Sequence, residues 1–121
     1  MSPGDGTSPA PEPSGFAVTP EQLKEMLDRG DAIDLIDIRE PYEWDIVRIP
    51  GARLVPMGQW LSGEALAGLR RDLRPVFYCR TGVRTLDVLA VARRAGYADA
   101  VHLEGGVVAW ANRIDPSLPV Y

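Results

Sequence analysis

The sequence predicts an α/β fold with a mainly parallel β-sheet. Short apolar runs typical of buried strands alternate along the chain with segments of helical period. The length of 121 residues is that of one domain, and a hydrophobic fraction of 45% suffices for a single core. There is no internal repeat. We therefore expect one α/β domain.

The first fifteen residues differ in composition from the rest, because ten of them are Pro, Gly or Ser. A segment of this kind buries too little apolar surface to offset the entropy lost on ordering. We interpret residues 1–15 as a disordered tail or linker, and residues 16–121 as the folded domain.

The first helix is predicted to begin at Pro20, because Thr19 can cap it and Gln22 completes a capping box. Gly30 is expected to end it. Its apolar face consists of Leu23, Met26 and Leu27.

The remaining elements alternate between the two types. Short apolar runs predict strands at residues 32–38, 52–56, 75–79 and 100–104. Helices are expected at 42–46, at 64–73 after a cap at Ser62, at 82–97 and at 107–114. In the helix at 82–97, the expected buried stripe is Val88, Leu89, Ala92 and Ala95, with Gly96 as the stop.

Charge and cysteine content exclude several classes of function. The net charge is −4, with 13 basic and 17 acidic residues spread along the chain, so a nucleic-acid or anionic-membrane surface is not expected. One cysteine excludes an intramolecular disulfide and a multi-cysteine metal site. The sequence has no apolar run of membrane-spanning length and no signal-peptide pattern at its start. We expect a cytoplasmic location.

The one cysteine lies in the segment YCRTGVRT, residues 78–85. Cys79 closes a predicted strand and a helix follows within a few residues, which places the thiol at the carboxyl edge of the sheet, where such folds bind ligands. The N–H groups and the dipole of a helix N-terminus favour anions. Thiols beside helix N-termini and arginines have pKa values lowered to roughly 3.5–7.5. We therefore expect Cys79 to be nucleophilic at neutral pH.

The neighbouring residues support this interpretation. Gly82 allows a tight turn, Arg84 is expected to hold an anionic substrate, and Thr85 is expected to add a hydroxyl or cap the helix. The alternative is that Cys79 is only a small buried hydrophobe. Two arginines and a glycine within six residues favour a reactive cysteine.

The segment Cys79-Arg80-Thr81-Gly82-Val83-Arg84-Thr85 resembles the active-site loop of the rhodanese-like sulfurtransferases. Residues 37–40, 49–52 and 103–106, with Ala109-Trp110, resemble three further signatures of this family in the right order. The resemblance implies a five-stranded parallel sheet with helices on both faces. It also implies a catalytic Cys79 that carries a persulfide, substrate-binding residues from Arg80 to Thr85, and no metal or organic cofactor.

Residues 43–47, 100–103 and 115–121 more narrowly resemble the C-terminal rhodanese domain of adenylyltransferase-sulfurtransferases of the molybdopterin-synthase-activating type. This resemblance implies a ubiquitin-like sulfur carrier as acceptor and an adenylating enzyme as partner. The sequence holds no adenylating domain, so a free-standing relative and an excised domain both stay open. Four arginines are expected to form a basic rim that attracts the acceptor: Arg48, Arg53, Arg80 and Arg84.

Three other functions stay open as alternatives. A general thiosulfate:cyanide sulfurtransferase would use the same cysteine. Related phosphatases and arsenate reductases have one more residue between cysteine and arginine, whereas Cys79 through Arg84 is a six-residue loop. Non-catalytic docking modules of this fold usually lack the cysteine.

Three further polar residues are candidates for supporting roles. His102 is the single histidine and lies in the middle of a predicted strand, so a structural role is favoured over activation of the thiol. Asp37 and Arg39 follow a strand, where the aspartate is expected to tie down a loop and the arginine to pair with a nearby carboxylate.

Overall fold

A five-stranded parallel β-sheet lies at the centre of the fold, with the strand order β1-β5-β4-β2-β3. The computed structural model describes residues 15–121, so the predicted tail lies outside the described residues except for Gly15. The strands are β1 (Ala17–Val18), β2 (Ile33–Asp37), β3 (Arg53–Leu54), β4 (Arg74–Tyr78) and β5 (Val101–Leu103). The helices are α1 (Pro20–Arg29), α2 (Pro41–Ile46), α3 (Met57–Leu61), the 3₁₀ helix η2 (Glu64–Gly68), α4 (Thr85–Arg94) and α5 (Gly106–Arg113). The predicted fold class is confirmed.

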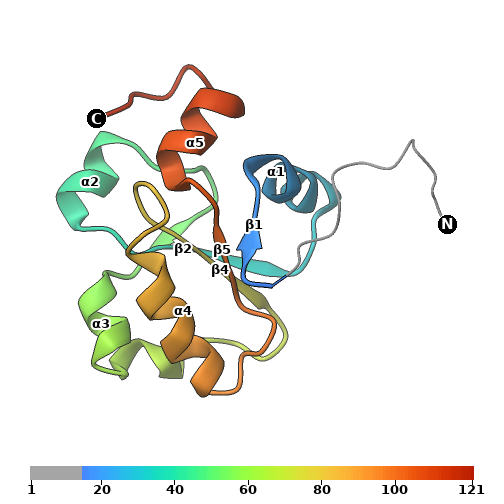
Figure 1. The fold of residues 1–121 in the computed structure, drawn as a ribbon, viewed down its shortest axis with the longest axis vertical. Helices are drawn as coiled ribbons and strands as arrows, with labels where there is room; N and C mark the ends of the chain where they lie inside the picture. Colours follow the sequence, from blue (N-terminus) through green and yellow to red (C-terminus); the bar gives the residue numbers. More distant parts are fainter. Residues whose placement is uncertain (1–14) are drawn as a thin grey trace, which may run out of the picture.

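Helices cover both faces of the sheet (Figure 1). On one face, α1 and α5 contribute Leu23 and Trp110 to a core that includes Val76 of β4. On the other face, α3 and α4 pack over Phe77, the next residue of the same strand. Because successive strand residues point to opposite faces, a sheet buried on both sides requires the continuous apolar runs that the sequence contains.

The first helix forms as predicted. Thr19 accepts a hydrogen bond from the Gln22 N–H, and the Gln22 side chain accepts one from the Thr19 N–H, which completes the capping box. Gly30 ends the helix in the left-handed conformation, with φ of 72°. Local capping chemistry is therefore sufficient to set both ends of α1.

The predicted helix at 64–73 is wrong. Ser62 instead follows α3, and only a 3₁₀ turn, η2, comes after it. The helix α3 has no polar cap at Pro56, so it carries no start signal. Burial positions it: Trp60 is fully buried, packs edge-on against Phe77 with ring centroids 5.0 Å apart, and donates to the Val55 carbonyl.

The strand β1 is absent from the prediction because two residues carry no readable period. It forms by pairing, since Ala17 lies opposite His102 and Val18 opposite Leu103. Helix α4 begins at Thr85, three residues later than expected, because residues 79–84 form a loop.

The carboxyl ends of the parallel strands meet at one edge of the sheet. There β2 leads toward α2, β4 leads into the loop at residues 79–84, and β5 leads into α5 (Figure 1). Asp37 and Tyr78, the last residues of β2 and β4, lie side by side in register. Three connections from distant parts of the sequence are thus brought together, as expected for a ligand site in this fold class.

None of the helices within residues 15–121 is both long enough and apolar enough to cross a membrane. The cytoplasmic location stays a prediction.

Candidate active site

The loop at residues 79–84 is held from behind by the first turn of α5. The Val107 N–H donates to the Cys79 carbonyl at 2.9 Å, and the Val108 N–H donates to the Arg80 carbonyl at 3.1 Å. These N–H groups belong to a helix N-terminus and have no partner within their own helix. The first two residues of the loop, Cys79 and Arg80, are therefore fixed between β4 and α5.

Two glycines permit this close approach. Gly106 has φ of 62°, and a Cβ there would collide with the Arg80 carbonyl. Gly82 has φ of 97°, and a Cβ would lie 3.2 Å from the Gly105 nitrogen. A side chain at Gly106 would push the loop away from α5. This explains why the segment at residues 103–106 has glycine at that position.

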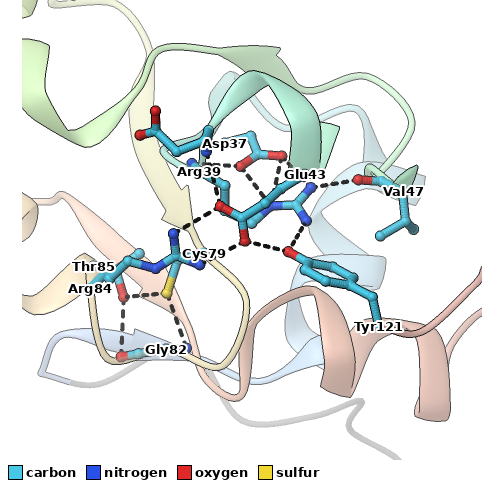
Figure 2. Close-up of polar contacts among 10 residues, drawn as sticks. Asp37, Arg39, Glu43, Val47, Cys79, Gly82, Arg84, Thr85 and Tyr121 are labelled. Atoms are coloured by element: carbon cyan, nitrogen blue, oxygen red, sulfur yellow. Dashed lines mark hydrogen bonds and ion pairs between the residues drawn. The ribbon is translucent and has the colours of Figure 1, made fainter. Parts of the chain in front are cut away.

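Cys79 lies buried beneath the loop, with a side chain that belongs to the core under α4. The Gly82 N–H points back at the sulfur and donates to Sγ at 3.2 Å (Figure 2). The Thr85 hydroxyl lies 4.0 Å from the same sulfur. Of the residues predicted to surround the thiol, the loop therefore brings Gly82 and Thr85 to the sulfur.

Thr85 connects the cysteine to the histidine. Its Oγ1 lies 2.7 Å from Nδ1 of His102 and donates to the Gly82 carbonyl at 3.2 Å. The hydroxyl makes no cap on α4, so of its two expected roles only the first fits the structure. His102 is buried, and this burial lowers its pKa, against the raising effect of Glu104.

Arg84 is engaged by a carboxylate that sequence reasoning did not assign to the site. Its Nη1 and Nη2 donate to Oε1 and Oε2 of Glu43 at 2.9 and 3.0 Å (Figure 2). These hydrogen bonds raise the pKa of Arg84 despite partial burial, and attraction to Cys79 adds to the effect. The guanidinium predicted to hold a substrate anion thus already faces an anion of the protein.

Glu43 is itself fixed on several sides. It is buried at the third position of α2 and accepts from the Glu40 N–H at 3.0 Å and from the Tyr121 hydroxyl at 2.6 Å. Burial alone would raise the pKa of Glu43, but the hydrogen bonds from Arg84, Glu40 and Tyr121 outweigh it and lower the pKa to about 2. The carboxylate is therefore ionised at every physiological pH.

Asp37 and Arg39 form a second ion pair beside the first. Both side chains are fully buried, with Arg39 Nη2 2.7 Å from Asp37 Oδ2. Arg39 also donates to the carbonyl of Val47 and, through Nη1, to the Tyr121 hydroxyl at 2.5 Å. Arg39 is thus paired with a carboxylate, and Asp37 also accepts from the backbone N–H of Arg39 just after the strand, contacts that fit the structural roles expected of both residues.

The predicted basic rim is only partly present. Arg53 pairs with Asp34 near the start of β2, away from the loop, and Arg84 pairs with Glu43. Arg48 stacks on the ring of Trp44 with its guanidinium carbon 4.6 Å from the centroid. Arg80 stacks in the same way over Tyr121 at 4.8 Å. Two of the four arginines are thus neutralised by carboxylates.

The other loop residues face outward. Thr81 is exposed, and 71% of Val83 is accessible to solvent. Within residues 15–121, no three histidine, cysteine, aspartate or glutamate side chains are placed to hold a metal ion together. The arrangement offers a sulfur nucleophile, a backbone N–H aimed at it, and an adjacent arginine–glutamate pair.

Glu43 and Tyr121 are the two site residues that sequence reasoning missed. Both lie in segments that resemble the adenylyltransferase-sulfurtransferases, which was the available signal, but the spacing between Glu43 and Arg84 carries no information about their contact.

Comparisons with known proteins agree with the motifs. Residues 19–113 match the family model described as the rhodanese-like domain. The chain is 50% identical over 107 residues to a protein of Mycobacterium tuberculosis named probable adenylyltransferase/sulfurtransferase MoeZ, a match that covers 88% of this chain and 27% of MoeZ. It is 34% identical over 91 residues to a protein of Allochromatium vinosum named sulfurtransferase, covering 75% of this chain and 83% of that one.

A solved structure supports the same conclusion. The human single-domain sulfurtransferase TSTD1 superposes with a TM-score of 0.68 at 26% identity, over 83% of this chain and 98% of that chain. The resemblance inferred from the four signatures is confirmed. The chain spans about a quarter of the length of MoeZ, so the activity, substrates and partners of that whole protein do not transfer with the match.

Proposed function

The chain belongs to the rhodanese-like family and is a rhodanese-type sulfurtransferase, and from this premise we propose that Cys79 carries sulfur as a persulfide. The observation that carries the proposal is the Gly82 N–H, which donates to the sulfur at 3.2 Å inside a loop fixed by α5. Such a donor stabilises negative charge on sulfur without the help of a metal or a general base.

The reaction divides into two displacements. In the first, the Cys79 thiolate attacks the outer sulfur of a sulfane donor; a new S–S bond forms, the donor's S–S bond breaks, and the leaving group departs with the electron pair. In the second, the outer sulfur passes to a nucleophile, which displaces the Cys79 thiolate, or to an activated acyl group, which the persulfide attacks. The expected kinetics are ping-pong.

Intact mass spectrometry tests the first displacement. Incubation with thiosulfate or with an organic thiosulfonate is expected to add the mass of one sulfur atom, and cyanide or a reducing thiol should remove it. Cys79→Ser, which replaces the nucleophile with a poorer one of similar size, should abolish the addition. A serine variant that formed thiocyanate at the wild-type rate would overturn the proposal.

The occupied guanidinium of Arg84 argues against the phosphatase or arsenate-reductase alternative. An arginine binds a tetrahedral oxyanion through the two parallel N–H groups of its fork, and here both terminal nitrogens donate to Glu43. A phosphate-ester assay beside the sulfur assay is expected to give no turnover. Hydrolysis of the ester without persulfide formation would favour the phosphatase.

For the acceptor, we infer a ubiquitin-like sulfur carrier activated as an acyl-adenylate. The 50% identity to a protein named adenylyltransferase/sulfurtransferase supports this inference. Two exposed apolar side chains beside the Glu43–Arg84 pair, Tyr42 and Val83, suit a protein acceptor better than a small hydrophilic one. The persulfide would attack the acyl carbon and release AMP, and a thiol would then reduce the acyl disulfide to a thiocarboxylate.

The test of the acceptor combines the persulfidated protein, a carrier, its adenylating enzyme, ATP and a thiol. Mass spectrometry is expected to show a thiocarboxylate at the end of the carrier, and Cys79→Ser should give none. If sulfur reaches cyanide or small thiols but never the carrier, the protein is a general thiosulfate:cyanide sulfurtransferase. If the wild-type protein and the serine variant both bind the carrier but neither of them takes up sulfur, the domain is a docking module.

A further inference from the structure

We propose that Glu43 sets the charge selectivity of this site, because it neutralises Arg84 and so favours a singly charged sulfur donor over a dianion. The proposal rests on the proposed persulfide chemistry and names the class of donor: a monoanionic persulfide or thiosulfonate, R–S–S⁻ or R–SO₂–S⁻. A dianion such as thiosulfate is the disfavoured donor.

The first argument is the state of Arg84. An unpaired guanidinium beside a thiolate offers a full positive charge and a two-pronged fork to an incoming anion. Here both terminal nitrogens of Arg84 donate to the two oxygens of Glu43 at 2.9 and 3.0 Å. An incoming anion therefore meets a closed ion pair and not a free cation.

The second argument is that Glu43 cannot easily withdraw. Its side chain is 4% exposed, and it accepts from the Tyr121 hydroxyl and the Glu40 N–H besides Arg84. To free Arg84, the carboxylate would have to leave all these donors together. The neutralising charge is thus part of the folded site.

The third argument is the sum of charge around the loop. Asp37 and Arg39 cancel each other in a fully buried pair, and Glu43 cancels Arg84. Among residues 15–121, no carboxylate pairs with Arg80, whose guanidinium lies over the Tyr121 ring. Of the two arginines of the loop, Arg80 is thus the one whose positive charge remains without a carboxylate partner.

The two classes of donor bring different numbers of negative charges to the loop during the reaction. Transfer from a monoanion is Cys–S⁻ + R–SO₂–S⁻ → Cys–S–S⁻ + R–SO₂⁻, so two negative charges meet at the loop. Transfer from thiosulfate is Cys–S⁻ + S₂O₃²⁻ → Cys–S–S⁻ + SO₃²⁻, so three meet there. With the fork of Arg84 occupied, thiosulfate brings one more unpartnered negative charge to the loop than a monoanion does, and the encounter with thiosulfate is weakened.

Two donors of nearly equal shape test the proposal. Methanethiosulfonate, CH₃–SO₂–S⁻, is thiosulfate with one charged oxygen replaced by a methyl group. We would measure kcat/KM for both donors with cyanide as acceptor at fixed ionic strength, and divide each by the rate constant of free cysteine with the same donor. The wild-type protein is expected to prefer methanethiosulfonate.

Glu43→Gln keeps the shape of the side chain and removes its charge. In this variant the ratio of kcat/KM for thiosulfate to that for methanethiosulfonate should rise about tenfold, because Arg84 regains a free positive charge. Glu21→Gln is the matched control, since Glu21 pairs with Arg113 on the exposed surface, away from the loop. It should leave the ratio unchanged.

The outcomes separate this proposal from the one on which it rests. If neither donor adds sulfur to Cys79, the persulfide proposal fails. If both donors add sulfur but Glu43→Gln leaves the ratio unchanged, only the selectivity proposal is overturned. If circular dichroism shows that Glu43→Gln is unfolded, the test rests on the donor preference of the wild-type protein. A wild-type preference for thiosulfate, after normalisation to free cysteine, would overturn the proposal.

Discussion

Two arginine–carboxylate pairs lie next to each other at the carboxyl edge of the sheet, and they differ in sequence separation and in exposure to solvent. Asp37 and Arg39 are two residues apart in the sequence, and both side chains are fully buried. Glu43 and Arg84 are 41 residues apart, and the side chain of Arg84 is 36% exposed. Tyr121 joins them, because its hydroxyl accepts from Arg39 and donates to Glu43 (Figure 2).

The difference separates a structural pair from one that faces the chemistry. The buried pair anchors backbone, since Arg39 donates to the Val47 carbonyl and Asp37 accepts from the Arg39 N–H. The partly exposed pair lies beside Cys79 and has solvent on one side. Breaking the first should therefore cost mainly stability, and breaking the second should change mainly which anions react.

The largest effect is expected from breaking the buried pair with Asp37→Asn. The amide cannot neutralise Arg39, whose charge would then be buried without a carboxylate partner. Removing one member of a buried pair costs about 3–5 kcal/mol of unfolding free energy. Denaturant titration monitored by circular dichroism measures this loss.

Asp34→Asn is the control for that variant. Asp34 lies in the same strand and pairs with Arg53, whose side chain is 43% exposed. An exposed pair contributes at most about 1 kcal/mol, so this variant should stay close to the wild type. Equal losses in the two variants would show that burial does not distinguish the pairs.

An intermediate effect is expected from titrating Glu43. Its pKa in the folded protein, about 2, lies below its ordinary value of 4.5, so the stabilisation is fully present above pH 4.5 and is lost as the pH falls through about 2. A shift of this size corresponds to about 3 kcal/mol. The difference in unfolding free energy between the wild type and Glu43→Gln should shrink by about this amount across that range.

Glu21→Gln again supplies the comparison. Slight burial raises the pKa of Glu21, and hydrogen bonds from its own N–H, Arg113 and Thr19 lower it, but the pair with Arg113 is exposed, so solvent screens its contribution to stability. The stability difference between that variant and the wild type should change little over the same pH range. A Glu43→Gln variant that paralleled the wild type at every pH would mean that Glu43 contributes no such stabilisation.

The sequence predicted a nearby carboxylate partner for Arg39 but no carboxylate partner for Arg84, for a physical reason. Asp37 and Arg39 are close in the chain, so a local rule for strand ends suffices to bring them together. The Cys79 loop is predictable in the same way, because the thiol, Gly82 and Arg84 lie within six residues. The contact of Glu43 with Arg84 depends on the parallel pairing of β2 and β4, which only the complete fold supplies.

The helices show the same difference between what local sequence predicts and what only the complete fold supplies. Thr19 and Gln22 cap α1 through contacts three residues apart, and this helix was predicted correctly. The helix α3 depends on Trp60, which is buried against Phe77 from another strand, and it was missed. Local hydrogen-bond chemistry can be read from the chain, whereas packing between distant segments cannot.

The smallest effect is expected from Tyr121→Phe, which keeps the aromatic ring under Arg80 and Arg39 and removes only the hydroxyl between the two pairs. Arg39 keeps Asp37 and the Val47 carbonyl as acceptors, so neither ion pair is broken and the loss should be about 1 kcal/mol of unfolding free energy.

The more informative readout of this variant is the acid range, that is, the pH range over which the protein loses stability on acidification. Without the hydroxyl, Glu43 loses one of the hydrogen bonds that lower its pKa, so that pKa should rise toward 4.5 and the loss of stability should begin at a higher pH. The exposed Tyr42, 66% accessible, gives the control Tyr42→Phe, which should leave the acid range unchanged. An identical acid range in both variants would show that Tyr121 does not connect the two pairs, and that the buried pair and the pair beside Cys79 are energetically independent.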